Sequence, residues 1–307
     1  MRPISENTVI QIDITNACHL NCANCTRFVG NHRKPYFMSL KDIRTAIASL
    51  AGFPGRVGIM GGEPALHPQF GVVLSLVREM IPKEKREFWT AGFKWDKYRD
   101  DIMETFLPER IAFNDHTQET GQHQPLLVAI EEVVDDPDLR ALLIDNCPFQ
   151  ARWSASITPK GAFFCEIAAA QDYLFDGPGG WPVEPGWWKR LDLSDQVDNY
   201  CQKCSGALPM PSFSDGRGGR DGKTIDIVSE GNLQRLFEVG STKAYKGNYI
   251  VWKDKVGLKE VEAAMENGWK PREFRSFEAH SPEDVEHARP EHAEARRKLY
   301  EEYGRWQ

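Results

Sequence analysis

Short stretches in the first half of the chain alternate apolar and polar residues with the period of a β-strand. Residues 9–14 (Val-Ile-Gln-Ile-Asp-Ile) show this pattern and predict a strand near the start of the chain. Comparable short apolar runs predict four further strands, at residues 57–60, 87–90, 111–114 and 141–144.

Between these runs, apolar residues recur at helical spacing. Ser39 is a suitable N-cap for a helix over residues 40–50, with Asp42 at the third helical position. Further helices are expected at residues 70–81, 98–106 and 125–134. Strands that alternate with helices predict a parallel sheet joined by right-handed crossovers, and therefore an α/β fold.

The second half of the chain opens with a predicted hairpin. Residues 152–157 alternate like a strand, residues 158–161 (Thr-Pro-Lys-Gly) predict a turn, and residues 162–165 predict the return strand. Helical patterns follow at residues 166–174, 191–200, 258–266 and 290–303. Residues 214–222, rich in Gly, Asp and Arg, are predicted to form a flexible linker.

The composition is that of an ordinary globular protein. A length of 307 residues suits one large or two small domains with a real core. No apolar run approaches the length of a membrane span, and the first residues show no signal-peptide core, so we expect no membrane partner. The net charge of −7 argues against a nucleic-acid partner. Exposed thiolates need a reducing compartment, which predicts a cytoplasmic location.

Seven cysteines fall into two sets, and the first set has the spacing C-x3-C-x2-C. Cys18, Cys22 and Cys25 directly follow the strand predicted at residues 9–14. Three thiolates on such a loop can bind three corners of one iron–sulfur cube and leave the fourth iron open to a small molecule. A zinc knuckle would need a fourth ligand, for which only His19 or His32 lies nearby.

The segment Gly61-Gly62-Glu63-Pro64 follows the second predicted strand. Together with the cysteine loop, it resembles the radical S-adenosylmethionine enzyme superfamily. The resemblance implies that Cys18, Cys22 and Cys25 hold a [4Fe-4S] cluster and that Gly61, Gly62, Glu63 and Pro64 form the turn that binds the methionyl group of S-adenosylmethionine. Glycines let a backbone approach a cofactor closely, and the Glu63 carboxylate would offset the cofactor's ammonium.

The same resemblance implies three more cofactor contacts. The superfamily usually has an aromatic residue before the third cysteine, where this chain has Asn24, which weakens the predicted adenine contact. Thr90 and Asn114 end the third and fourth predicted strands. Because these motifs all follow strand carboxyl ends, as in β/α barrels, we expect an open, partial (β/α) barrel. The barrel is truncated, since only four or five strands fit before Cys147.

The second cysteine set closes with a C-x2-C pair and suits either zinc or a full [4Fe-4S] cluster. One cysteine precedes the predicted hairpin, one lies on its return strand, and the pair follows a short helix; these are Cys147, Cys165, Cys201 and Cys204. This order resembles the small α+β twitch domain, a shortened SPASM domain, and is most similar to butirosin-type aminocyclitol dehydrogenases. The resemblance implies a second, auxiliary [4Fe-4S] cluster.

These observations divide the chain into three predicted parts. Residues 1–145 would form the partial-barrel core and residues 146–211 the twitch-like auxiliary-cluster domain. Residues 212–307 would form a helical carboxy-terminal extension of unknown role.

The reaction follows from what the resemblance implies. One electron from a flavodoxin- or ferredoxin-type donor would cleave S-adenosylmethionine to a 5′-deoxyadenosyl radical, which abstracts hydrogen from a substrate C–H bond. Radical epimerases commonly return a hydrogen atom from a cysteine thiol, but two fully ligated clusters would leave no thiol free. A dehydrogenase needs instead a base and an acceptor for a second electron, which the auxiliary cluster would provide. We therefore expect oxidation of an alcohol to a ketone in a sugar, aminocyclitol or related small molecule.

Substrate-binding residues are predicted from position alone. His116, Arg152 and Glu166 are the candidates for a proton acceptor or a hydroxyl clamp. Asp115 and the pair Trp187 and Trp188 are further candidates, and each of these residues has an ordinary structural role as an alternative.

Three other functions remain open from the sequence. Epimerisation would be possible with a tyrosine as hydrogen donor, or with a cluster that lacks one ligand. Peptide modification is typical of SPASM-type enzymes, although the first strand begins too early to leave room for a preceding peptide-binding domain. A zinc-binding scaffold would leave residues 61–64 without a role.

Overall fold

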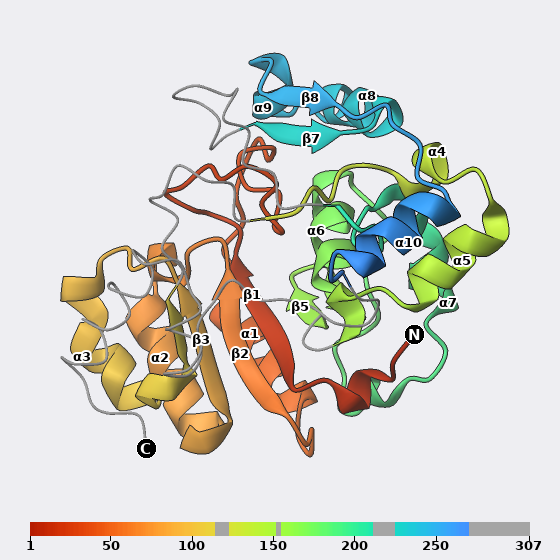
Figure 1. The fold of residues 1–307 in the computed structure, drawn as a ribbon. Coiled ribbons are helices and arrows are strands. Elements are labelled where there is room, and N and C mark those ends of the chain that lie inside the picture. Colours follow the sequence, from red (N-terminus) through yellow and green to blue (C-terminus); the bar gives the residue numbers. More distant parts are fainter. Residues whose placement is uncertain (114–122, 152–154, 211–224, 270–307) are drawn as a thin grey trace.

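A six-stranded sheet, in the order β4-β3-β2-β1-β5-β6, forms the centre of the molecule (Figure 1). The computed structural model describes residues 1–113, 123–151, 155–210 and 225–269. Four consecutive strands run parallel: β1 (Val9–Thr15), β2 (Arg56–Gly61), β3 (Arg86–Thr90) and β4 (Ile111–Phe113). The predicted α/β class is confirmed, and four of the five strands predicted before Cys147 form.

Three helices connect these strands and share a hydrophobic core with β1. They are α1 (Leu40–Ser49), α2 (Phe70–Met80) and α3 (Trp95–Thr105). Ser39 caps α1 as predicted, because its hydroxyl accepts a hydrogen bond from the Asp42 amide. Ile10, Ile12 and Ile14 of β1 belong to the core shared with the helices. The residues between them, Gln11 and Asp13, are buried on the opposite face of the strand.

Two elements near residue 140 differ from the prediction. Residues 141–144, predicted as a fifth strand, lie in α5 (Pro137–Asp145), which Asp136 caps through the amides of Asp138 and Leu139. Of the helix predicted over 125–134, only α4 (Ile130–Val133) forms. Leu127 instead makes a β-bridge to Val228, which holds the preceding segment extended.

The predicted hairpin extends the main sheet. β5 (Ser156–Thr158) pairs in parallel with β1, and β6 (Gly161–Phe163) returns antiparallel to β5. The helices α6 (Glu166–Leu174) and α7 (Ser194–Tyr200) follow. The domain boundary predicted after residue 145 therefore separates β1–β4 from β5 and β6, although all six strands belong to one sheet.

The carboxy-terminal part contains strands as well as helices. β7 (Asp226–Val228) and β8 (Tyr249–Val251) form a second, two-stranded parallel sheet. Beside it lie α8 (Glu230–Glu238) and α9 (Thr242–Tyr245), whereas α10 (Leu258–Glu266) lies next to α5 and shares a hydrophobic cluster with α4 and α5 (Figure 1). The linker predicted at 214–222 and the helix predicted at 290–303 lie outside the described residues.

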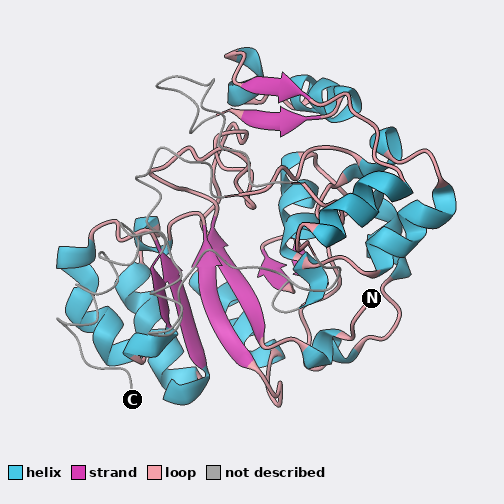
Figure 2. Cartoon of the chain, viewed as in Figure 1, coloured by secondary structure: helices cyan, strands magenta, loops and turns pink. Residues whose placement is uncertain are grey.

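Short 3-10 helices complete the secondary structure, at Ile4–Glu6, Pro64–Leu66, Lys83–Lys85, Pro108–Arg110, Phe149–Ala151, Trp187–Lys189 and Cys201–Lys203. No helix in the described part of the chain is both long and apolar enough to cross a membrane. The segment between β1 and α1 is loop (Figure 2).

Candidate functional site

The first cysteine set lies on the loop between β1 and α1, and all three of its side chains are half-buried. Burial raises the pKa of Cys18 to about 12, and the neighbouring Cys25 and Glu63 add to this increase. Burial likewise raises the pKa of Cys22 to about 12, again with contributions from the other two cysteines. Thiols in this setting keep their protons until a metal takes up the thiolate charge, which couples cluster binding to proton release.

Gly61 and Gly62 bring the end of β2 against this loop. The amide of Gly62 donates to the Thr15 carbonyl oxygen at 2.7 Å, and the amide of Glu63 donates to the Ala17 carbonyl oxygen at 2.7 Å. A Cβ atom on Gly61 would lie 2.0 Å from the Thr15 oxygen, and one on Gly62 would lie 2.3 Å from the Ala17 oxygen. Gly61 and Gly62 are therefore required for the close contact between the end of β2 and the backbone at Thr15 and Ala17, just before Cys18.

Glu63 is fully buried and joins the end of β2 to the end of β3. Its carboxylate accepts hydrogen bonds from the Thr90 hydroxyl at 2.9 Å, the Ala91 amide at 2.8 Å and the Ala65 amide at 3.2 Å. Burial raises the pKa of Glu63, and these hydrogen bonds oppose the increase. Thr90 contacts both carboxylate oxygens, at 2.9 and 3.1 Å, so the predicted ammonium would share acceptor positions with these donors. Thr90 acts here by orienting Glu63.

Asn24 is buried and has a positive φ of 51°. Its side-chain oxygen accepts a hydrogen bond from the Ile227 amide at 2.9 Å, while its side-chain nitrogen is buried with no partner among the described residues. The residue at the predicted adenine position thus attaches the cysteine loop to β7.

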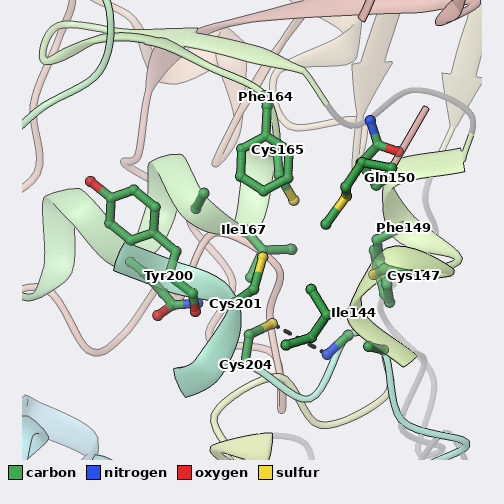
Figure 3. Close-up of a pocket in the computed structure, with 15 residues that line it drawn as sticks. Ile144, Cys147, Phe149, Gln150, Phe164, Cys165, Ile167, Tyr200, Cys201 and Cys204 are labelled. Carbon is green, nitrogen blue, oxygen red and sulfur yellow. Dashed lines mark hydrogen bonds between the residues drawn. The ribbon is translucent and has the colours of Figure 1, made fainter. Parts of the chain in front are cut away.

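The four cysteines of the second set line one cavity (Figure 3). The cavity contains about 410 Å³ of empty space, including its open side. Its remaining walls are mostly apolar, and they include Ile144, Phe149, Phe164 and Ile167. Cys147, Cys165, Cys201 and Cys204 come from the end of α5, the end of the hairpin and the turn after α7, as the sequence order predicts.

Backbone amides point at the sulfur atoms of this set. The Gly206 amide donates to Cys204 Sγ at 3.2 Å, and the amides of Phe149 and Gln150 donate to the thiol of Cys147. A Cβ on Gly206 would lie 3.4 Å from Cys204 Sγ and 3.6 Å from Cys147 Sγ. Burial raises the pKa of Cys147 to about 12 and raises the pKa of Cys204 as well. Hydrogen bonds to sulfur of this kind tune iron–sulfur clusters.

No group of three or more His, Cys, Asp or Glu side chains among the described residues is arranged to hold a single metal ion. The nearby histidines of the first loop have other contacts. His19 stacks on Phe93 with ring centroids 4.6 Å apart, and His32 Nε2 lies 3.0 Å from the carbonyl oxygen of Arg27.

Glu166 lies in a buried ionic network rather than at an open surface. Its carboxylate lies 3.0 Å from a guanidinium nitrogen of Arg27 and accepts from the Gln11 side chain at 2.7 Å. Arg27 also contacts Asp13 at 3.2 Å, and all of these side chains are buried. Burial alone would lower the pKa of Arg27, but the two carboxylates outweigh burial and raise it.

The other predicted substrate residues divide into two groups. Asp115, His116 and Arg152 lie outside the described residues, as does Asn114, a predicted cofactor contact, so all four remain predictions. Trp187 and Trp188 are buried against the carboxyl end of α1 and the residues after it. Trp187 Nε1 donates to the Ser49 hydroxyl at 3.3 Å, and Trp188 packs edge-on against Phe53. These contacts match the structural role that the sequence leaves open as the alternative for both tryptophans, and stacking on a substrate stays a prediction.

Sequence reasoning missed three buried charged residues beside the cysteines. Arg27 follows Cys25 by two positions, and that adjacency is the one signal that pointed to it. Two residues of the carboxy-terminal part contact the first cysteine loop. Asp226 accepts a hydrogen bond from the Asn24 amide at 2.7 Å, and Lys243 donates one to the Cys22 carbonyl oxygen at 2.7 Å. Nothing in the local sequence around either residue indicates this contact.

Comparison with known proteins finds no matching family model and no matching curated protein. Among solved structures, BtrN in complex with AdoMet and 2-DOIA is 18% identical over 54% of this chain and 76% of that chain, with a TM-score of 0.38. BtrN in an open conformation is 15% identical over 68% of this chain and 91% of that chain, with a TM-score of 0.41. Similarity at this level establishes neither a family nor an activity, and function is therefore inferred from the residues of this chain.

Proposed function

We propose that the chain is a radical S-adenosylmethionine oxidoreductase that oxidises an alcohol of a sugar, aminocyclitol or related small molecule to a ketone. One observation carries the proposal: the seven cysteines form two separate sets, each in a place suited to a cluster. Three follow β1 beside the turn at residues 61–64, and four surround a single cavity. When bound at the first set, the [4Fe-4S] cluster and S-adenosylmethionine would supply a radical able to abstract hydrogen from carbon.

The protein's own residues would position these groups. Cys18, Cys22 and Cys25 would ligate three irons, and the Glu63 carboxylate, held by Thr90 and Ala91, would face the cofactor's ammonium. The second set fits a cluster in its chemistry: four thiols around one cavity, two of them already accepting amide hydrogen bonds. In a cube, each of the four thiolates would ligate a separate iron.

Oxidation of an alcohol to a ketone removes one hydrogen atom, one proton and one electron from the substrate. The cofactor-derived radical would accept the hydrogen atom, and a cluster at the second set would accept the electron. The proton needs a base, for which His116 remains the predicted candidate, and Arg152 remains the candidate for a hydroxyl clamp. An external flavodoxin- or ferredoxin-type donor would supply the electron that starts each turnover.

The test is to measure iron, sulfide and zinc per chain after anaerobic reconstitution. We expect about eight iron and eight sulfide with no zinc, as two cubane clusters require. A variant with Cys18, Cys22 and Cys25 replaced by Ala should retain about four of each, and so should a variant that lacks the four cysteines of the second set. Four iron and one zinc in the unmodified chain would remove the electron acceptor, and negligible iron would refute the radical mechanism.

Epimerisation has one observation in its favour. Tyr36 and Tyr173 pack together with ring centroids 4.7 Å apart, and Tyr36 donates a hydrogen bond to the Asp13 carbonyl oxygen, close to the polar face of the sheet. A tyrosine in this position could return a hydrogen atom to a substrate radical. Turnover in D₂O distinguishes the two reactions, since an epimerase would leave deuterium on carbon in the product and a dehydrogenase would give a ketone.

A further inference from the structure

Residues of the carboxy-terminal part of the chain contact the first cysteine loop, the segment between β1 and α1 that carries Cys18, Cys22 and Cys25. Lys243 of α9 is 2% exposed, and its ammonium donates to the Cys22 carbonyl oxygen at 2.7 Å and to Asp226 Oδ1 at 2.9 Å. A buried lysine is costly unless it is paired, so these two contacts account for its burial.

Asp226 extends this contact to other positions on the loop. Its Oδ1 accepts from the Asn24 amide at 2.7 Å, and its Oδ2 accepts from the Asn31 side chain at 2.8 Å. The Ile227 amide donates in return to the side chain of Asn24 at 2.9 Å. The carboxylate therefore has three donors, two of which belong to the cysteine loop.

Two residues beside Lys243 continue the attachment. Ser241 donates to the Asn31 side-chain oxygen at 2.5 Å, and the hydroxyl of Thr242 donates to the carbonyl oxygen of Gly30. Gly30 has a φ of +88°, which disfavours any other residue, and a Cβ there would lie 1.7 Å from Asn21 Oδ1 and 2.9 Å from the Lys243 side chain. Hydrogen bonds thus reach the loop at Cys22, Asn24, Gly30 and Asn31.

We propose that residues 226–248 clamp the first cysteine loop, and that Lys243 is the positioning residue that fixes the backbone of Cys22 and raises the reduction potential of the cluster bound there. The proposal rests on the proposed function, since it concerns the first cluster. The reduction potential of an iron–sulfur cluster depends on nearby charge and hydrogen bonding, and a fixed cation favours the reduced, more negative state.

The first experiment needs no cluster and uses the full chain without metal. Hydrogen exchange of residues 18–31 is compared for the unmodified protein and for Lys243→Met, Lys243→Arg and Lys253→Met. Lys253 is the matched control, since it lies in the same part of the chain with an exposed side chain. Loss of a charge-assisted hydrogen bond should accelerate exchange in residues 18–31 by about tenfold or more in Lys243→Met, with little change in Lys253→Met.

The second experiment measures the cluster itself after reconstitution. The midpoint potential is followed by dithionite titration, using the electron paramagnetic resonance signal that changes when S-adenosylmethionine is added. We expect a more negative potential in Lys243→Met, partial rescue in Lys243→Arg and no shift in Lys253→Met.

The two experiments separate this proposal from the proposed function. Unchanged exchange in residues 18–31 of Lys243→Met overturns the clamp, whether or not iron binds. Faster exchange with an unchanged potential overturns the tuning role of Lys243. If the unmodified chain takes up no iron, the proposed function fails, while the exchange result still decides whether residues 226–248 hold the loop.

Discussion

Gly61 and Gly62 show how one residue type can serve a site through the backbone. In the sequence they suggest close approach to a cofactor; in the structure they allow the end of β2 to hydrogen bond with the chain between β1 and Cys18. The placement of the first cysteine and the placement of Glu63 therefore depend on the same pair of glycines.

Substitution of Gly62 by alanine should disrupt this part of the fold. The new Cβ would lie 2.3 Å from the carbonyl oxygen of Ala17, a contact that only a backbone shift can relieve. We expect Gly62→Ala to lower the free energy of unfolding by about 1–3 kcal/mol and to reduce iron uptake. Gly71→Ala in α2 is the control, because nothing lies within 4 Å of its Cβ position and alanine stabilises a helix interior. Equal thermal unfolding of the two variants would contradict the prediction.

The burial of His67 should lower the free energy of unfolding in mild acid. The ring is buried and neutral, with Nε2 2.9 Å from the Met38 carbonyl oxygen and Nδ1 accepting from the Gln69 amide at 3.2 Å. Burial lowers its pKa, so below about pH 6.5 the unfolded chain binds a proton that the folded chain does not. This contribution to stability is present above that pH and is lost as the pH falls, at up to about 1.4 kcal/mol per pH unit.

Urea unfolding at pH 7.5 and pH 5.5 measures this effect. The unmodified protein should lose more stability between the two pH values than His67→Gln does, since glutamine does not titrate. A loss of the same size in both proteins would assign the pH dependence to other groups.

At the scale of elements, the ion pair between Arg27 and Glu166 joins the two cysteine-bearing parts. Arg27 lies two residues after Cys25, and Glu166 directly follows Cys165 at the start of α6. The pair lies on the face of β1 that carries Gln11 and Asp13, where water is excluded. Glu166 therefore has a structural partner, which agrees with a role in holding α6 against the first loop.

A double-mutant cycle tests this role on the cluster-free protein. Arg27→Met leaves Asp13 and Glu166 buried without their cation and should cost about 3–5 kcal/mol. Glu166→Gln should cost less, since Asp13 still pairs with Arg27, and the double variant should cost less than the two single effects together. The exposed pair Arg44–Glu79 is the control and should show little or no coupling. Additive effects at Arg27 and Glu166 would show that the two parts are not coupled through this pair.

The elements that sequence could predict are those with local signals. The spacing of Cys18, Cys22 and Cys25 and the capping by Ser39 are encoded within a few residues, and so are the four parallel strands. Residues 141–144 were assigned wrongly because a continuous apolar run has no period, and the Asp136-Pro137 helix start decides the structure there. The contacts of Asp226 and Lys243 join positions far apart in the chain, and no local pattern records them.

At the scale of the molecule, three separate parts of the chain meet around the first cysteine loop. The turn at residues 61–64 supports it from β2, α6 reaches it through Arg27, and residues 226–248 hold it from the other sheet. The carboxy-terminal part, which the sequence left without a role, is thus attached directly to the predicted site. Its contacts are polar and buried, so they specify one arrangement of the loop.

The pairing of β5 with β1 also protects the sheet from other chains. A protein cut after residue 145 would turn β1 into an edge strand, with the groups that pair with β5 at Gln11 and Ile12 left unpaired beside a row of isoleucines. Such an edge accepts strands from neighbouring molecules, so the isolated core would aggregate rather than remain monomeric. The four parallel strands and the part that carries the second cysteine set therefore need to be expressed and engineered as one piece.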